Sequence, residues 1–531
     1  MEKTNMYANI PAEKFQFAKR TLSHDSKLST KPVGYFQDAF RRFCKNKGAV
    51  VGGIVIAMLI LFAIIAPFCT PYSPSYTDKL YATTSPKLPL AEKLGWDFWD
   101  GCKVKEVGYR AFLQDYALGL ETGKDVIKRG EYTVSEDGTL YTYRYNTYYG
   151  VGFGKYRIIS NEEYLDIQRY QDETGRQVLY PTVAPWARPE ATQDKDNANF
   201  YYKTEKDKGG KTVPVYDENG DLQLNYWEMA AGSTSGLAAD YTSKMRIEGE
   251  DGFMKGDKQY FYVYGQKVVG GVEVRADYYE YYTYKHTQLL KDGIEEPNFI
   301  FGTTSEGKDI FACLSNGARF SFIFATVVAV SNFIVGVIWG SISGYFGGKI
   351  DLFMERFSEI LGSVPSMIVI TLLKYHMGSS THVLILFISF FLTGWIGMAG
   401  RTRMQFYRFK NQEYVLAART LGASDARIMF KHIFPNGIGT IVTSVALVIP
   451  SMIYSETSLS YLGIINLEAG KLTSVGTLIN AGQNAFASGE AYRAYVALFP
   501  CAFLVLLMLS FNLFGNGLRD AFNPSLRGSE E

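Results

Sequence analysis

Residues 302–309 nearly form a phosphate-binding loop. Such a loop needs Gly-x4-Gly-Lys followed by Ser or Thr, because its amides and lysine hold phosphates and its hydroxyl binds magnesium. Gly302, Gly307 and Lys308 follow this spacing, but Asp309 stands where the hydroxyl is required. A carboxylate there would place a negative charge against the phosphate. We therefore expect no nucleotide to bind at this segment.

Other chemistry-bearing side chains are scattered. The chain has five cysteines, with no Cys-x-x-Cys pair and no neighbouring histidine cluster: Cys44, Cys69, Cys102, Cys313 and Cys501. This pattern predicts neither a metal site nor a disulfide framework. His432 has no partner set for catalysis and is expected to act as a helix-end cap or to contact lipid headgroups. A net charge of +1 argues against nucleic-acid binding.

Long apolar runs indicate a membrane protein. The run from Ala49 to Phe68 carries no charge. As a helix it is long enough to cross a hydrocarbon core of about 30 Å. Five further spans are predicted: Phe320–Gly344, Ile360–Met377, His382–Ala399, Gly439–Leu462 and Tyr495–Phe514. The span that starts at Ile360 is interrupted by Pro365, Lys374 and His376. The sequence thus predicts six transmembrane helices.

Residues 71–297 have a different composition. They hold 28 of the 38 tyrosines and many turn residues. Thr139–Tyr149, Gln259–Tyr264 and Lys267–Arg275 are predicted strands, and Asn161–Glu173 is a predicted helix with Asn161 as its cap. We expect a folded α+β or mainly β domain, with its tyrosines in the core and on the surface. A recognition surface for peptides or a receptor is the alternative role for these tyrosines.

Charge asymmetry orients the predicted spans. Residues 1–48 are basic, and the loop 401–437 carries seven Lys or Arg between Arg401 and Lys431 against Glu413 and Asp425. Because positive loops stay in the cytoplasm, both segments and the tail 517–531 are expected inside. The division is therefore a tail (1–48), a first helix (49–70), an extracytoplasmic domain (71–297), a membrane core (298–516) and a tail (517–531).

The loop 413–435 is predicted to form two short helices. Glu413 to Leu421 suits a helix, and Gly422 can end it in a left-handed conformation. Ser424 or Asp425 can then cap a second helix over Ala426–Ile433. Pro435 and Asn436 are expected to close that helix. Paired surface helices on a membrane frame are suited to receive force from a cytosolic partner.

This loop resembles the ATPase-docking loop of ABC importer permeases. Ala417, Ala418, Gly422 and Pro435 match the family pattern, and Leu416 stands where the family has glutamate. The longer string that starts at Glu413 is similar to the form in oligopeptide, dipeptide and nickel permeases. Residues 301–311, 317–319, 344–348, 456–463 and 517–524 also resemble segments of the "C-type" oligopeptide permease subunit. The likeness covers the first span and residues 299–528, so residues 71–297 are an insertion without a counterpart.

The resemblance implies a type I ABC importer-like, all-α polytopic permease subunit in the bacterial cell membrane. It implies no cofactor bound directly, with ATP and Mg held by two cytosolic ATPase subunits. A second homologous permease subunit and an extracytoplasmic substrate-binding protein are the other implied partners, within the lipid bilayer. The implied coupling residues are Glu413, Ala417, Ala418, Arg419, Gly422, Ala423, Ser424, Arg427, His432 and Pro435.

Glu456 lies inside a predicted span, where a carboxylate is costly and usually faces a cavity or a partner group. One interpretation is that Glu456, with Ser455 and the kink expected at Pro450, lines the translocation path or an outer gate. The other is a structural hydrogen bond to Ser455, Ser458 or a neighbouring helix. Gly336, Gly340 and Gly344 recur every four residues, which close helix packing explains.

The rival class is a membrane-anchored receptor or enzyme whose working part is the extracytoplasmic domain. It predicts a catalytic or ligand-binding set within residues 72–297. That stretch holds one histidine, His286, and one cysteine, Cys102. The permease interpretation is therefore favoured, with oligopeptides or dipeptides as the substrates.

Overall fold

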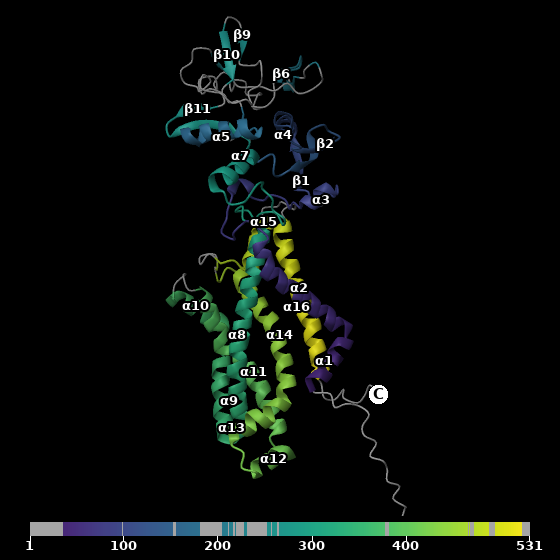
Figure 1. Cartoon of the computed structure of the whole chain (residues 1–531), viewed down its shortest axis with the longest axis vertical. Coiled ribbons are helices and arrows are strands. Elements are labelled where there is room, and N and C mark those ends of the chain that lie inside the picture. The colour runs from purple at the N-terminus through teal and green to yellow at the C-terminus, as the bar shows by residue number, and fades with distance from the viewer. Residues whose placement is uncertain are drawn as a thin grey trace, which may run out of the picture.

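Five long apolar helices run side by side in the computed structural model (Figure 1). The structure describes residues 35–97, 99–151, 156–180, 265–377, 382–465, 467, 472–487 and 494–522, with short pieces between 204 and 262. The five helices are α2 (Lys47–Ile65), α8 (Ile310–Phe346), α11 (His382–Phe409), α14 (Phe434–Tyr461) and α16 (Tyr495–Phe522). Each is long and apolar enough to cross a membrane. Five of the six predicted spans are confirmed.

The sixth predicted span, Ile360–Met377, is wrong as a single helix. Two helices, α9 (Gly348–Gly362) and α10 (Ser366–Met377), meet at a bend of 67° and form one broken span or a re-entrant segment. Pro365 lies in the break. A proline lacks an amide donor and disfavours helical geometry in the residue before it, here Val364, so the helix cannot run through.

The contact between α8 and α11 depends on glycine. A Cβ built on Gly340 would lie 2.2 Å from the Ala399 carbonyl oxygen, and one on Gly344 would lie 2.7 Å from the Phe406 Cβ. Only a residue without a side chain allows these two backbones to approach so closely. The four-residue glycine spacing is therefore explained by helix packing, as predicted.

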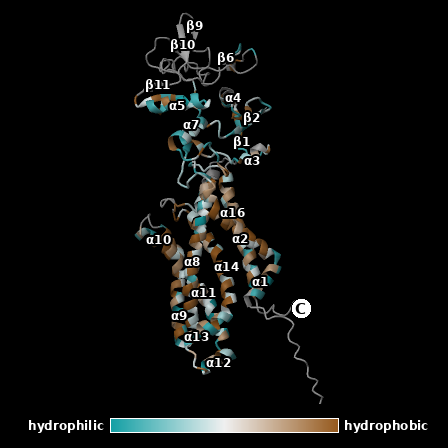
Figure 2. Ribbon diagram, in the orientation of Figure 1, coloured by the Kyte–Doolittle hydropathy of each residue, from teal (hydrophilic) through white to brown (hydrophobic). Residues whose placement is uncertain are grey.

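Hydrophobic residues dominate the helical bundle, whereas polar residues dominate the region between α2 and α8 (Figure 2). The short helix α1 (Tyr35–Lys45) precedes α2 and contacts α16, where the Phe43 and Phe514 rings lie 5.2 Å apart. Asn46 caps α2 by accepting a hydrogen bond from the Ala49 amide. The predicted tails lie largely outside the described residues.

The inserted region (residues 71–297) contains both strands and helices. One sheet has the order β1-β3-β2 and a second the order β11-β12-β4, with β5 also paired to β12. The elements of these two sheets are β1 (Cys102–Gly108), β2 (Ile127–Val134), β3 (Leu140–Asn146), β4 (Tyr156–Ile159), β5 (Leu179–Tyr180), β11 (Gly265–Val268) and β12 (Gly271–Ala276). The described helices are α3 (Pro89–Lys93), α4 (Tyr109–Thr122), α5 (Asn161–Thr174) and α7 (Tyr278–Tyr284).

Shorter strand pairs lie farther from the bundle (Figure 1). They are β6 (Thr204–Lys206) with β7 (Thr212–Pro214), and β8 (Glu228–Ala230) with β10 (Lys258–Tyr262) and β9 (Gly252–Lys255).

Two predictions need correction. Lys267–Arg275 is a hairpin rather than one strand, because Gly270 and Gly271 turn the chain with positive φ. The cap of α5 is Ser160, whose hydroxyl accepts from the Glu163 amide, so Asn161 is already helical.

Tyrosines form the core at the base of the inserted region. Tyr81, Tyr148 and Tyr282 are buried against Phe299, and Tyr81 contacts the Tyr148, Tyr282 and Phe299 rings. His286 is buried too. Its Nε2 is hydrogen-bonded to the Tyr76 hydroxyl at 3.2 Å, and its Nδ1 is hydrogen-bonded to the Asp292 carboxylate at 2.7 Å. This chain of contacts joins the segment after α2 to the segment before α8. These tyrosines therefore serve packing, the first of the two predicted roles.

A backbone seam ties the inserted region to the bundle. The Thr83 amide donates to the Thr304 carbonyl at 3.0 Å, and the Lys87 amide donates to the Phe299 carbonyl at 3.0 Å. The hydroxyl of Tyr495, the first residue of α16, donates to the Thr303 carbonyl at 3.3 Å. The seam thus fixes the base of the inserted region on the ends of α8 and α16.

Candidate functional site

The loop between α11 and α14 lies at the end of the bundle away from the inserted region (Figure 1). It contains α12 (Glu413–Thr420), α13 (Asp425–Arg427) and a π-helical turn (Ile428–Ile433). Val415, Ile428 and Ile433 are fully buried and pack with Phe406. A small core of its own therefore holds the loop against α11.

The turn between α12 and α13 has the predicted geometry. Gly422 adopts φ of +78°, the left-handed conformation that glycine alone reaches without steric cost. Its amide donates to the Arg419 carbonyl at 3.0 Å, and the Ala423 amide donates to the Ala418 carbonyl at 3.1 Å. Ser424 has the extended backbone of an N-cap, without a side-chain capping bond in the structure.

The prediction that Pro435 and Asn436 close the second helix is wrong. The chain continues from α13 through the π-helical turn into α14 as one span from Asp425 to Tyr461. Pro435 stands in the first turn of α14, where a missing amide costs no regular helical hydrogen bond. The loop is therefore directly continuous with a membrane helix.

One tyrosine attaches the loop to α8. The Tyr345 hydroxyl donates to the Asp425 carboxylate at 2.6 Å, and Arg419 donates to the same hydroxyl at 3.4 Å. The Arg419 guanidinium also lies 5.8 Å from the centre of the Tyr345 ring. Tyr345 was absent from the predicted site, although it stands in the Gly344–Gly348 segment that resembled the family. The contact explains how two distant stretches of sequence form one unit.

The loop presents a mixed apolar and charged surface. Leu421 is 88% exposed and Leu416, in the position of the family glutamate, is 47% exposed. Glu413, Ala417 and Arg427 are exposed near them, whereas Ala418, Ala423 and His432 are half-buried. The His432 carbonyl accepts from the Asn436 side chain at 2.8 Å. An exposed leucine at a turn is the kind of residue that a partner pocket covers.

A network of charged side chains supports the same end of the bundle. Asp351 of α9 accepts two hydrogen bonds from Arg403 of α11, at 2.6 and 2.7 Å, and one from Tyr407. Ser343 of α8 also donates to Asp351, and Arg403 pairs with Glu355 at 2.6 Å. This network joins three helices beside the loop. Sequence reasoning missed it because Arg403 and Tyr407, which bind Asp351 from another helix, lie 52 and 56 positions away from it.

Glu456 is enclosed between helices. It is fully buried in α14, and its carboxylate accepts from Ser321 of α8 and from Ser460, each at 2.9 Å. Ser455 is half-buried on another face of α14 and donates to its own helix, at the Ser451 carbonyl. Pro450 is buried within α14. The structure does not bring these three predicted path residues together, and it places Glu456 in a helix-to-helix hydrogen bond.

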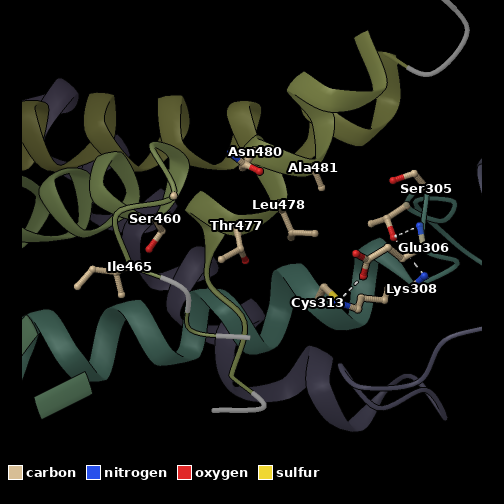
Figure 3. A pocket seen from close by; sticks show the side chains of 12 residues that line it. Ser305, Glu306, Lys308, Cys313, Ser460, Ile465, Thr477, Leu478, Asn480 and Ala481 are labelled. Atoms are coloured by element: carbon tan, nitrogen blue, oxygen red, sulfur yellow. Dashed lines mark hydrogen bonds and ion pairs between the residues drawn. The ribbon is translucent and has the colours of Figure 1, made fainter. Parts of the chain in front are cut away.

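A polar cavity of about 220 Å³ lies near the inserted region, between the Thr304–Lys308 turn and α15 (Val475–Ala487) (Figure 3). Glu306 and Lys308 pair at its edge at 2.8 Å. Ser460, which donates to Glu456, forms part of its wall. The Glu456 carboxylate therefore lies directly behind a residue that lines this cavity.

The segment 302–309 is a helix cap rather than a phosphate loop. Asp309 accepts from the Phe311 and Ala312 amides at 3.2 and 3.1 Å and so caps α8. Its own carboxylate occupies the helix N-terminus, where a phosphate would have to bind. The geometry agrees with the rejection of a nucleotide site here.

Two parts of the sequence match known family profiles. Residues 336–528 match the profile "Binding-protein-dependent transport system inner membrane component", and residues 34–89 match "N-terminal TM domain of oligopeptide transport permease C". The chain is 41% identical to the oligopeptide transport system permease protein OppC of Bacillus subtilis over 253 residues. That match covers 48% of this chain and 80% of the relative.

Two other relatives carry similar names. The chain is 39% identical over 227 residues to the dipeptide transport system permease protein DppC of Bacillus subtilis, covering 43% of this chain and 69% of the relative. It is 37% identical over 232 residues to OppC of Escherichia coli, covering 44% and 74%. A solved inward-facing MetNI methionine ABC transporter aligns with 40% of this chain and 96% of its own at 16% identity, but its TM-score of 0.32 is too low to argue from.

The protein is thus a multi-pass membrane component of an ABC importer. It belongs to the family of binding-protein-dependent transport system inner membrane components, as a permease subunit without a nucleotide site of its own. The rival class of anchored receptor or enzyme is not favoured by these relatives. The two profiles leave residues 90–335 unmatched, which include most of the inserted region.

Proposed function

We propose that this subunit forms, with a second homologous permease subunit, the path by which oligopeptides or dipeptides cross a bacterial cell membrane. Support comes from relatives at about 40% identity that are named oligopeptide and dipeptide permeases. An extracytoplasmic binding protein delivers the substrate to the side that carries the inserted region. Both termini and the loop 401–437 then lie in the cytoplasm, as their positive charge favours.

Two cytosolic ATPase subunits, which hold ATP and Mg, dock on the loop 413–435. The observation that carries this proposal is the exposure of Leu421 on a turn that a buried core and Tyr345 hold in place. Leu416 and Leu421 enter an apolar groove of the ATPase. Glu413 and Arg427 of the loop form the charged border of this contact. Ala417 and Ala418 let the ATPase approach closely because their side chains are small.

Coupling follows from the continuity of the loop with α14. A push on α12 and α13 acts through the π-helical turn on α14 and through Tyr345 on α8. Nucleotide shifts the permease between outward- and inward-facing states because the ATPases contact this loop differently in the two states. Arg419, Ala423, Ser424 and His432 shape the loop rather than contact the ATPase deeply.

The docking proposal is tested by Leu421→Asp and Glu413→Lys in the complete complex. Each should reduce co-purification of the ATPases and abolish peptide uptake, while the permease still folds. Leu165→Asp is the matched control, since Leu165 is 55% exposed on α5 in the inserted region. ATPase association and uptake at wild-type levels in both loop variants would refute the docking role.

Glu456, Ser455 and Pro450 stay a predicted part of the translocation path. The cavity beside Ser460 supports this role for Glu456, because a small rearrangement of the Ser460 side chain would expose the carboxylate. Glu456→Gln removes the ionisable carboxylate, while the amide oxygen can still accept from one serine and the amide nitrogen can donate to the hydroxyl oxygen of the other. A selective loss of uptake for positively charged peptides would support a path residue, whereas unchanged uptake of all peptides would leave only the structural hydrogen bond.

A further inference from the structure

A small loop projects from the base of the inserted region beside α16. Residues 88–99 are closed at their base, where the Leu88 amide donates to the Trp99 carbonyl at 2.8 Å, and they contain α3. Three large apolar side chains of this loop are more than half exposed: Leu90 at 61%, Leu94 at 55% and Trp96 at 58%. Exposed apolar residues gathered on one short loop mark a contact surface.

The loop is fixed at the level where α16 enters the membrane. Trp99 stacks on Phe499, the fifth residue of α16, with ring centres 5.6 Å apart, and its indole donates to the Ile300 carbonyl at 2.5 Å. Phe301 stacks on the same Phe499 ring at 4.2 Å. Figure 1 shows α3 beside and just above this end of α16. The headgroup layer extends roughly 5–8 Å beyond the hydrocarbon core, so the loop lies within reach of it.

We infer that Leu90, Leu94 and Trp96 insert into the headgroup–acyl boundary of the bilayer leaflet on the side of the inserted region. Leu498, next to Phe499, is 58% exposed on α16, so the apolar surface of the loop continues a lipid-facing surface. Tryptophan is enriched at this depth because its ring is apolar and its N–H is polar. The neighbouring Asp97 is neutralised by Lys128 at 2.9 Å and Arg144 at 2.7 Å, so it does not repel anionic headgroups.

Lipid rather than protein covers these side chains, because the loop is anchored on a membrane helix and carries a tryptophan and leucines, residues that suit the membrane interface. The inserted region therefore rests on the membrane at a second place, apart from the seam that joins it to α8. This contact would hold the region upright beside the pathway.

The test is a depth measurement on the full chain in bilayers of phosphatidylethanolamine and phosphatidylglycerol. A nitroxide is attached at Leu94→Cys, in a background with the five native cysteines replaced, and its collision rates with oxygen and with a water-soluble nickel chelate are compared. Val104→Cys is the matched control, because Val104 is 63% exposed on β1. The oxygen-to-nickel ratio at Leu94 should be several-fold above that at Val104.

Equal ratios at the two positions would overturn the inference, since both sites would then lie in water. Low collision rates with both reagents at Leu94 would also overturn it, because they would show that protein covers the loop. A second measurement avoids the cysteine replacements. The fluorescence of Trp96 is obtained by subtracting the emission of Trp96→Phe from that of the wild type. Lipids brominated near the headgroup should quench this difference strongly. An absence of quenching would contradict lipid contact.

Discussion

Tyr345 and Asp425 are 80 positions apart in the sequence and share a hydrogen bond of 2.6 Å. This bond joins the last turn of α8 to the first residue of α13, so one hydroxyl connects a membrane helix to the exposed loop. Arg419 approaches the same hydroxyl from α12. Both short helices of the loop are thereby tied to α8 at one point.

Removing this hydroxyl should weaken coupling. Tyr345→Phe keeps the ring but removes a hydrogen bond to a charged group, worth about 1.5–3 kcal/mol. We expect peptide uptake by the reconstituted complex to fall about tenfold or more, with ATP hydrolysis less affected. Tyr375→Phe is the control, because Tyr375 is 85% exposed on α10. Equal peptide uptake in the two variants would show that the Tyr345–Asp425 hydrogen bond does not contribute to coupling.

Gly422→Ala should destabilise the turn. Alanine in a left-handed conformation costs about 1–2 kcal/mol, although no neighbouring atom lies within 4 Å of the added Cβ. Gly397→Ala is the matched control, since its Cβ also meets nothing and its backbone is helical. Thermal unfolding and uptake should decline for Gly422→Ala alone. A parallel decline in both variants would point to a cause other than backbone strain.

Gly340→Ala should damage the fold. The new Cβ would lie 2.2 Å from the Ala399 carbonyl oxygen and 2.8 Å from the Thr402 Cβ, which forces α8 and α11 apart. Overpacking of this kind costs about 1–3 kcal/mol. The fraction that stays monodisperse after heating in detergent should drop, whereas Gly400→Ala, with open space around its Cβ, should behave like the wild type.

Asp351→Asn should lower stability more than a surface substitution does. The substitution removes the bidentate ion pair with Arg403, which keeps its bridge to Glu355, at a cost of roughly 1.5–3 kcal/mol. Glu359→Gln removes the exposed bridge to Arg356, which is worth about 0–1 kcal/mol. The two unfolding midpoints should therefore differ by several degrees. Similar midpoints would mean that the Asp351 network adds nothing to stability.

Cys102 should react slowly with alkylating reagents. Burial and the nearby Asp100 carboxylate raise the pKa of its thiol to about 12, and only the thiolate is the nucleophile. Because the pKa is raised, the thiolate fraction stays small at neutral pH and grows about tenfold for each pH unit up to that value. Mass spectrometry of maleimide adducts should show the exposed Cys44 and Cys69 modified before Cys102. A labelling rate of Cys102 that is flat above pH 8 would contradict the raised pKa.

The membrane helices were predictable because their signal is local. Uncharged runs of span length can be recognised from consecutive residues alone. The same holds for Gly422, which directly follows a stretch of helix-forming residues. Pro365 gave warning of the break in the sixth span, but the bend of 67° could not be read from hydropathy. Pro435 misled the prediction, because a proline is compatible with the start of a helix as well as with its end.

The remaining features depend on contacts between distant residues. Tyr345, Asp351 and Trp99 each acquire a role only when another helix or strand supplies the partner. The Tyr-rich composition indicated a folded region but gave no order for its strands. Glu456 was recognised as unusual, but its hydrogen bond with Ser321 of another helix could not be read from the sequence.

The seam between residues 83–87 and 299–304 links the inserted region mechanically to the membrane helices. Since it fixes the base of the inserted region on α8 and α16, any tilt of these helices moves the β11–β12 hairpin along an arc, because Val272 and Val274 of β12 belong to the same core as Tyr81 and Phe299. The displacement grows with the length of that arm, so a small rotation inside the bilayer becomes a large one at its tip. A fluorophore pair spanning the hairpin and a fixed point would let single transport cycles be timed optically in an intact membrane.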